Sequence, residues 1–219
     1  MLDLHLGEKR MKLLTFLLAP ALLTAASVNV VNPGFELAAP STPLSSALNS
    51  YDTVTQPYGW TVTVGNLEFV QNAYCCGWVV NEGAYAVDLN GVGGDNTVLT
   101  QSISGFTPGV DYILTFGFSA NPFFCTPGSP CTMTASIGAA SANYSIGQSS
   151  MSWSDQSIAF TAASSTLSLT FTNTTGLGGN GGPAIDDIRI NEAAPEPASM
   201  LLGGAGLALL LYRRRKLVE

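Results

Sequence analysis

Basic residues are nearly absent from the long central part of this chain. Between Ser27 and Ala194 the only one is Arg189, and the single histidine, His5, precedes this part. Without histidine or lysine, the central part cannot build a Ser–His or Cys–His nucleophile pair, a Schiff base or a histidine-bound zinc site. It also lacks the lysine of a phosphate-binding glycine loop. These absences exclude most classes of enzyme.

Acidic residues are plentiful in the same part. Eleven of them stand against one basic residue, so its net charge is −10, compared with −7 for the whole chain. Such a surface repels the phosphates of nucleic acids, which we exclude as partners, and attracts divalent cations. Hydrolysis by an Asp/Glu pair is the realistic catalytic chemistry that remains. Because acidic surface residues are usually only solvated, we expect a protein that is not an enzyme.

The N-terminus has the three parts of a secretory signal peptide. Lys12 precedes an apolar stretch over residues 13–23, and the small residues 24–26 form a cleavage site. We therefore predict a signal peptide over residues 1–26. Met11 is the more natural start, because residues 2–10 only lengthen the charged region.

The C-terminus combines a Pro-Glu-Pro motif, an apolar run over 198–212 and a basic tail over 213–216. The motif is Pro195, Glu196 and Pro197, and the tail begins with Arg213, Arg214 and Arg215. The run of 15 residues is shorter than the ~20 that cross a bilayer comfortably. The basic tail should stay cytoplasmic.

This C-terminal order resembles the PEP-CTERM sorting signal of Gram-negative bacteria. The resemblance implies an exported protein that a short transmembrane helix holds transiently in the inner membrane and that an exosortase processes. The protein would then reach the cell surface, the outer envelope or the secreted matrix. An ordinary C-terminal anchor is the alternative interpretation.

Four cysteines lie in the central part: Cys75, Cys76, Cys125 and Cys131. An even number in an exported chain predicts two disulfides, for which three pairings exist. The turn-forming residues 126–130 would let Cys125 and Cys131 pair, but that leaves a strained bond between the adjacent Cys75 and Cys76. We favour pairing between the two loops, because it avoids this strain. Zinc binding is less favoured, because adjacent cysteines are poorly spaced for it.

Residues 27–194 are expected to form a single all-β domain, a β-sandwich or jelly roll. Short runs of alternating apolar residues are separated by Gly, Pro, Ser, Thr and Asn, and helical patterns are missing. The predicted strands are Trp60–Val64, Leu67–Gln71, Ala84–Leu89, Val98–Ile103, Tyr112–Ser119, Met133–Ile137, Gln156–Thr161, Thr166–Thr172 and Ile185–Ile190.

An ordered set of motifs spans almost the whole domain. It begins with Asn32-Pro33-Gly34-Phe35-Glu36, continues through Gly59-Trp60 and Asp88-Leu89-Asn90-Gly91, and ends with the segment 182–190. The order resembles the choice-of-anchor C family of exported bacterial domains. The resemblance implies a galactose-binding-like jelly roll, related in architecture to carbohydrate-binding modules. The cysteine-bearing loops depart from this pattern and look like insertions.

One carboxylate in the last strand suggests a metal site. Strand alternation places Asp186 on the same face as Ile188 and Ile190, toward the core. A buried carboxylate is costly unless it is paired or metal-bound. The family resemblance implies a structural calcium ion between the first and last strands, with Glu36 as the second ligand. The alternative is that backbone N–H groups and water hold Asp186.

Candidate ligand residues lie in loops and at strand ends. The apolar faces of sugars lie flat on aromatic rings, and Trp78 and Tyr74 belong to a loop-like segment. Asp88 and Asn121, at strand ends, could bind hydroxyls. We therefore expect a non-enzymatic module that binds extracellular polysaccharide in a biofilm or matrix. The alternative is a structural matrix or adhesin component without a sugar pocket.

Overall fold

The computed structural model describes residues 26–39, 42–43, 50–52, 57–73, 78–91, 96–176 and 181–194. The predicted signal peptide, the whole segment 195–219, and the loop residues Tyr74, Cys75 and Cys76 lie outside these residues. Over the ranges that are described, no helix is long and apolar enough to span a membrane.

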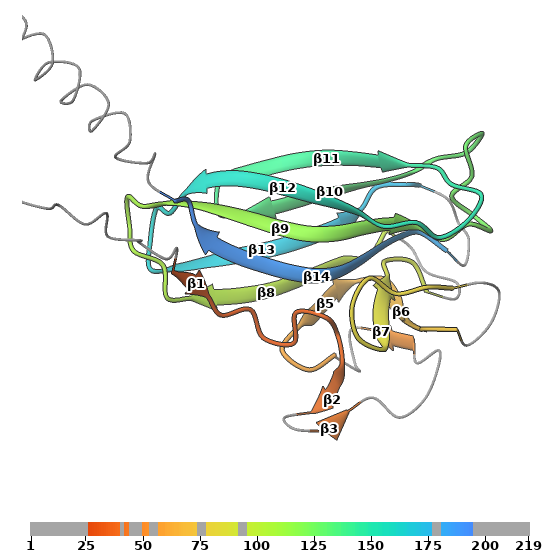
Figure 1. Ribbon diagram of the computed structural model, residues 1–219, viewed down its shortest axis with the longest axis horizontal. Coiled ribbons are helices and arrows are strands. Elements are labelled where there is room, and N and C mark those ends of the chain that lie inside the picture. Colours follow the sequence, from red (N-terminus) through yellow and green to blue (C-terminus); the bar gives the residue numbers. More distant parts are fainter. Residues whose placement is uncertain are drawn as a thin grey trace, which may run out of the picture.

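Two antiparallel sheets pack face to face (Figure 1). The larger has seven strands in the order β12-β9-β14-β7-β6-β4, and β1 also pairs with β14. Its strands are β1 (Ser27–Val28), β4 (Ser50–Asp52), β6 (Asn66–Gln71), β7 (Tyr85–Asp88), β9 (Asp111–Ala120), β12 (Ser154–Thr161) and β14 (Pro183–Glu192).

The smaller of the two main sheets has five strands in the order β11-β10-β13-β8-β5. They are β5 (Thr61–Val64), β8 (Val98–Ser104), β10 (Cys131–Ile137), β11 (Ala140–Ile146) and β13 (Thr166–Asn173). A separate two-stranded sheet joins β2 (Leu37–Ala39) to β3 (Thr42–Pro43). The predicted all-β sandwich is confirmed, and each of the nine predicted strands is present.

The core fills the space between the sheets with alternate side chains of both. Aromatic rings meet across it: the centroids of Phe116 and Phe171 are 5.2 Å apart, and those of Phe171 and Trp60 are 6.2 Å apart. These side chains are at most 3% exposed. Their burial supplies the main free energy of folding, at roughly 25 cal/mol per Å² of apolar surface.

The Asn32–Glu36 motif is a loop that closes the core beside the last strand. Asn32 has a φ of 51°, and its side chain accepts a hydrogen bond from the Leu37 N–H (3.0 Å) and donates one to the Tyr58 carbonyl (3.1 Å). This clamp directs Phe35, which is fully buried, against Trp60. The Ile188 N–H then bonds to the Pro33 carbonyl at 3.1 Å.

The chain enters and leaves the sandwich at the same place. β1 pairs with the end of β14, with Ser27 opposite Asn191, and the Glu192 N–H donates to the Ala26 carbonyl at 2.8 Å. At its other end β14 begins beside the end of β9, with Pro183 opposite Ala120. β14 therefore connects the two ends of the sandwich (Figure 1).

A β-bulge in β14 corrects the predicted orientation of Asp186. Asp187 has a φ of 49°, and the register with β9 shifts between Asp186 and Arg189. The extra residue lets Ile185 and Ile188 both enter the core. Asp186 therefore lies on the outer face of the seven-stranded sheet, not on the face of Ile188 and Ile190. Simple alternation failed because a bulge adds one residue to the count.

The disulfide joins Cys125 to Cys131, with Cα atoms 5.0 Å apart. The favoured pairing of these two cysteines with Cys75 and Cys76 is wrong. The residues between them form a tight turn, closed by the Ser129 N–H donating to the Thr126 carbonyl at 3.0 Å. This turn brings the two cysteines within bonding reach before any long-range contact is needed.

Candidate functional site

A buried carboxylate ties three strands together at one end of the seven-stranded sheet. Asp88, 1% exposed, ends β7. One of its oxygens accepts hydrogen bonds from the Asn90 N–H (2.9 Å) and the Gly182 N–H (2.8 Å). The other accepts from the Asn121 amide at 3.0 Å. The ends of β7 and β9 and the start of β14 are thus fixed to one another.

Asn121 also shapes the turn that follows it. Its side-chain oxygen accepts from the Phe123 N–H at 3.1 Å. Its carbonyl accepts from the N–H groups of Phe124 (3.1 Å) and Cys125 (2.8 Å). Phe123 and Phe124 are left 59% and 38% exposed. An exposed pair of phenylalanines on a braced turn is unusual, and exposed apolar patches commonly mark contact sites.

The disulfide and a neighbouring loop hold this turn from the other side. The Gln148 N–H donates to the Cys125 carbonyl at 2.8 Å. The Gln148 side chain in turn donates to the Ser152 carbonyl at 2.9 Å, and the Ser119 hydroxyl donates to the same carbonyl at 3.0 Å. The loop over 147–153 is therefore attached to both the phenylalanine turn and β9.

A second aromatic group continues from that loop across the outer face of the sheet. Trp78 packs in a small cluster with Val70, Val80 and Ala86, against which Trp153 and Met151 also pack. The Trp153 indole donates to the Val79 carbonyl at 2.7 Å. Val79 itself is 51% exposed. Trp78 is only 7% exposed, and its indole N–H has no acceptor within the described residues.

We call these groups the loop-end surface: Trp78, Val79, Phe123, Phe124 and Trp153, supported by Asp88 and Asn121. Asp88 and Asn121 are brought together as strand-end residues, but they bind each other and the main chain. Trp78 lies in the same region, and Tyr74 is outside the described residues. The sequence analysis missed Phe123 and Phe124. Two adjacent phenylalanines between Asn121-Pro122 and a cysteine turn, outside any alternating run, were the available signal.

The carboxyl of Asp88 sits in a strongly desolvated environment. Burial raises its pKa well above its usual range, against the opposing hydrogen bonds from Asn121 and Asn90. The negative charge of Glu68, directly opposite on β6, raises the pKa further. Neither carboxyl is more than 8% exposed. A carboxylate pair this deeply buried is poorly placed to reach a glycosidic bond.

The two residues of the predicted calcium site are held by main-chain amides. Asp186 accepts from the N–H groups of Asn81 and Glu82 (both 2.9 Å) and of Asp187 (2.8 Å). Glu36 accepts from the N–H groups of residues 84 (2.8 Å) and 85 (3.0 Å). The loop over 81–85 therefore receives one carboxylate from the first loop and one from the last strand.

Amide hydrogens occupy both oxygens of Asp186 and Oε1 of Glu36, which leaves fewer lone pairs for a calcium ion. Gly83 (φ +64°) lies so close that a Cβ there would collide with Glu36. In the described part of the chain, no group of three or more His, Cys, Asp or Glu could hold a metal. Burial raises the pKa of Asp186 to about 7, the three amides opposing this and Glu36 adding to it. Calcium here stays a prediction.

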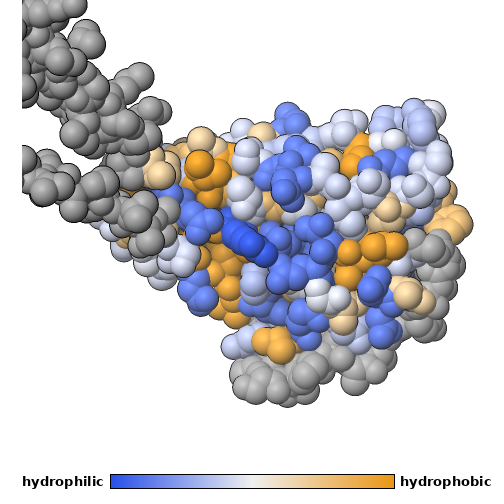
Figure 2. Space-filling model, in the orientation of Figure 1, coloured by the Kyte–Doolittle hydropathy of each residue, from blue (hydrophilic) through white to orange (hydrophobic). Residues whose placement is uncertain are grey.

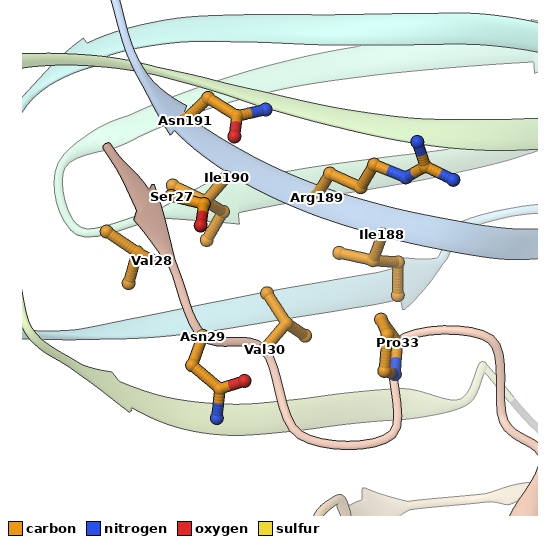
Figure 3. A pocket seen from close by; sticks show the side chains of 9 residues that line it. All are labelled: Ser27, Val28, Asn29, Val30, Pro33, Ile188, Arg189, Ile190 and Asn191. Carbon is orange, nitrogen blue, oxygen red and sulfur yellow. The ribbon is translucent and has the colours of Figure 1, made fainter. Parts of the chain in front are cut away.

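A cavity of about 270 Å³ lies where the first segment separates from β14 (Figure 3). Val30, Pro33 and Ile188 lie around it. Arg189 is also at its rim, but the guanidinium is paired with Glu82 (2.8 Å) and Asp187 (2.6 Å). Ser27, Asn29 and Asn191 also line the cavity, but Asn29 and Asn191 point in different directions in Figure 3. These polar groups do not converge on one point, as they would in a ligand pocket.

Comparison with family models identifies the family of this domain and its C-terminal signal. Residues 28–191 match the family described as "Protein of unknown function (DUF642)", and residues 193–216 match the PEP-CTERM protein-sorting motif. The chain belongs to the DUF642 family. The predicted sorting signal is confirmed, and it indicates an exported protein of Gram-negative bacteria that an exosortase processes. The comparison with curated proteins found no match.

Solved structures share the sandwich fold of this DUF642 domain. The Stig cyclase Fisc from Fischerella sp. TAU, in complex with (3Z)-3-(1-methyl-2-pyrrolidinylidene)-3H-indole, has a TM-score of 0.56 at 18% identity, covering 79% of this chain and 100% of its own. TmCBM61, in complex with beta-1,4-galactotriose, has a TM-score of 0.50 at 15% identity, covering 77% and 100%. One fold thus serves both a cyclase and a sugar-binding module, so function must come from the site.

Proposed function

We propose that this protein is an exported, non-enzymatic carbohydrate-binding protein that contacts extracellular polysaccharide through the loop-end surface. The observation that carries the proposal is the exposure of Phe123 and Phe124 on a turn held by a disulfide, Asn121 and Asp88. Rings fixed in this way lose little conformational entropy on binding, and they offer flat apolar faces to a sugar ring.

The chemistry around the turn supports binding rather than catalysis. The chain has no histidine or lysine between Ser27 and Ala194, and Asp88 and Glu68 are buried beneath the loops. The Trp78 indole N–H has no acceptor among the described residues, but it is buried, so Trp78 supports the surface from beneath and does not itself contact a sugar. Sugar binding by TmCBM61, which has a similar fold, is consistent with this role.

A glycan array tests the proposal with the purified protein and a double variant, Phe123→Ala with Phe124→Ala. We expect binding to at least one glycan, and a loss of about tenfold or more in the variant, because each stacked ring contributes roughly 1 kcal/mol. The control is Ile113→Ala, which removes an exposed apolar side chain elsewhere on β9 and should bind as the wild type does.

Three results would contradict the proposal. Binding that is as strong in the double variant as in the wild type would place the sugar site elsewhere. The absence of binding to every glycan would favour the alternative role of a structural matrix or adhesin component without a sugar pocket. Release of reducing ends from a bound glycan would contradict the non-enzymatic assignment.

A further inference from the structure

The two main sheets divide the charge of the molecule unequally. Among the strands that the structure describes, charged residues occur only in the seven-stranded sheet. They are Asp52, Glu68, Asp88, Asp111, Asp155, Asp186, Asp187, Arg189 and Glu192. The strands β5, β8, β10, β11 and β13 contain no charged residue.

The outward side chains of the five-stranded sheet are almost all hydroxyls. Their inward neighbours in the alternation, such as Leu99, Met133 and Leu169, are buried in the core. The outward hydroxyl residues are Thr61, Thr63, Thr100, Ser102, Ser104, Thr132, Thr134, Ser136, Ser141, Ser145, Thr166, Ser168, Thr170 and Thr172. We call this array the hydroxyl face.

The hydroxyls lie in regular rows. One row crosses all five strands through Thr61, Thr100, Thr170, Ser136 and Ser141, which are successive cross-strand partners. Strand geometry spaces neighbours in a row by about 4.8 Å and neighbouring rows by about 6.8 Å. The face therefore presents a repeating two-dimensional pattern of groups that each donate and accept hydrogen bonds.

These groups are already paired in part with one another. The hydroxyls of Thr100 and Ser168 are 3.2 Å apart, and those of Ser104 and Thr166 are 2.9 Å apart. In both pairs either oxygen can be the donor. Hydroxyls that can reverse their direction adapt to a partner whose own hydroxyls vary in orientation.

The composition of the hydroxyl face indicates which class of partner it can bind. A charged polymer would find no opposite charge there, and Arg189 lies on the other sheet in two ion pairs. A protein interface usually needs an apolar or aromatic centre, whereas the large exposed apolar residue on these five strands is Val64, at the edge. An uncharged polysaccharide exchanges one hydroxyl hydrogen bond for another without desolvating a charge.

We propose that the hydroxyl face is a second contact surface, which binds uncharged polysaccharide. It is separate from the loop-end surface and does not depend on it. The two surfaces together would let one domain grip a polymer at two places, which raises the strength of attachment beyond either contact alone.

Affinity electrophoresis in polysaccharide-containing gels tests the proposal with the purified protein. The neutral gels contain β-1,4-galactan, β-1,3-glucan, β-1,4-glucan or mannan, and the acidic gel contains alginate. We expect retardation in at least one neutral gel and none in alginate. Ser102→Lys with Ser168→Lys places two charges on the face and should weaken retardation about tenfold. Thr134→Val with Thr170→Val removes two hydroxyls at nearly constant shape and should weaken it about fivefold.

The matched control is Ser157→Lys with Ala159→Lys, which adds the same charge to the outer side of β12 and should leave retardation unchanged. Melting curves confirm that each variant is folded. Normal retardation of both hydroxyl-face variants, or none of the wild type in any neutral gel, overturns the proposal. Loss confined to the Phe123→Ala, Phe124→Ala variant would also overturn it while supporting the loop-end surface. Loss of retardation confined to the hydroxyl-face variants would support the hydroxyl face and contradict binding at the loop-end surface.

Discussion

The two sheets of this sandwich differ in the polar side chains on their outer faces and in whether loops cover them. The seven-stranded sheet carries carboxylates and covers several of them with loops whose N–H groups satisfy them, as at Asp88 and Asp186. The five-stranded sheet carries hydroxyls that remain at the surface and pair with one another. Figure 2, in the orientation of Figure 1, shows hydrophilic side chains across the middle of the visible surface, with apolar patches on both sides. The charged side chains thus occur on the sheet whose loops supply N–H donors to several of them.

Removing a buried carboxylate from the seven-stranded sheet should lower the free energy of unfolding most, far more than removing a hydroxyl from the five-stranded sheet. Asp88→Ala leaves the Asn90 and Gly182 N–H groups and the Asn121 amide buried without their acceptor. At roughly 1–3 kcal/mol for each group, we expect a loss of about 4 kcal/mol in the free energy of unfolding. Urea denaturation measures this loss. Ser102→Ala on the hydroxyl face is the control and should change stability by less than about 0.5 kcal/mol. A loss below about 1 kcal/mol for Asp88→Ala would contradict the role assigned to it.

Deprotonation of Asp186, the other carboxylate that a loop covers, should lower the free energy of unfolding by an intermediate amount. The pKa of Asp186, about 7 in the folded protein, lies above its unfolded value of about 3.9. The folded state therefore binds this proton more tightly between those values. Its contribution to stability, a few kcal/mol, is complete below about pH 4 and is lost as the pH rises to about 7. Unfolding free energies measured across this range should fall accordingly.

The variant Asp186→Asn provides the control for this pH dependence. It has no carboxyl to titrate, so the fall between about pH 4 and pH 7 should be much smaller than in the wild type. It should also be less stable than the wild type at low pH, since an amide nitrogen would face N–H donors. An equal slope in both proteins would assign the titration to another group.

Calcium should have the smallest effect on the stability of the domain. Amide hydrogen bonds already occupy both oxygens of Asp186 and Oε1 of Glu36, so we expect the melting temperature to differ little between added calcium and added chelator. A bound ion would instead raise it by an amount that grows with calcium concentration. A calcium-dependent rise that Asp186→Ala abolishes and Asp187→Ala preserves would establish the predicted metal site.

Local patterns predicted most of the fold. Nine strands followed from alternation, but the short strands β1 to β4, of two or three residues each, were not predicted. The longer strand β11 was missed because its inward side chains include the small residues Ala140 and Ala142. Their weak apolar signal resembles that of a loop, although Tyr144 packs on Phe116. The bulge at Asp187 was also missed, since a single inserted residue leaves no mark in the sequence other than reversed alternation.

The candidate site was predicted less well, for a physical reason. Asp88 and Asn121 were correctly placed at strand ends, yet their sequence separation of 33 residues hides the hydrogen bond that joins them. Polar residue type suggested sugar contact, whereas burial gives both a positioning role. Exposure, which singles out Phe123 and Phe124, is decided by tertiary packing and cannot be derived from residue type.

The adjacency of Ala26 and Glu192 places both ends of the described domain at the same end of the sandwich. An attachment through either terminus holds the sandwich by the same end, while the turn bearing Phe123 and Phe124 follows the end of β9 at the other (Figure 1). β14, with ten residues, separates the two ends by about 30 Å. A tether joined to either terminus would therefore attach at the end of the sandwich opposite Phe123 and Phe124.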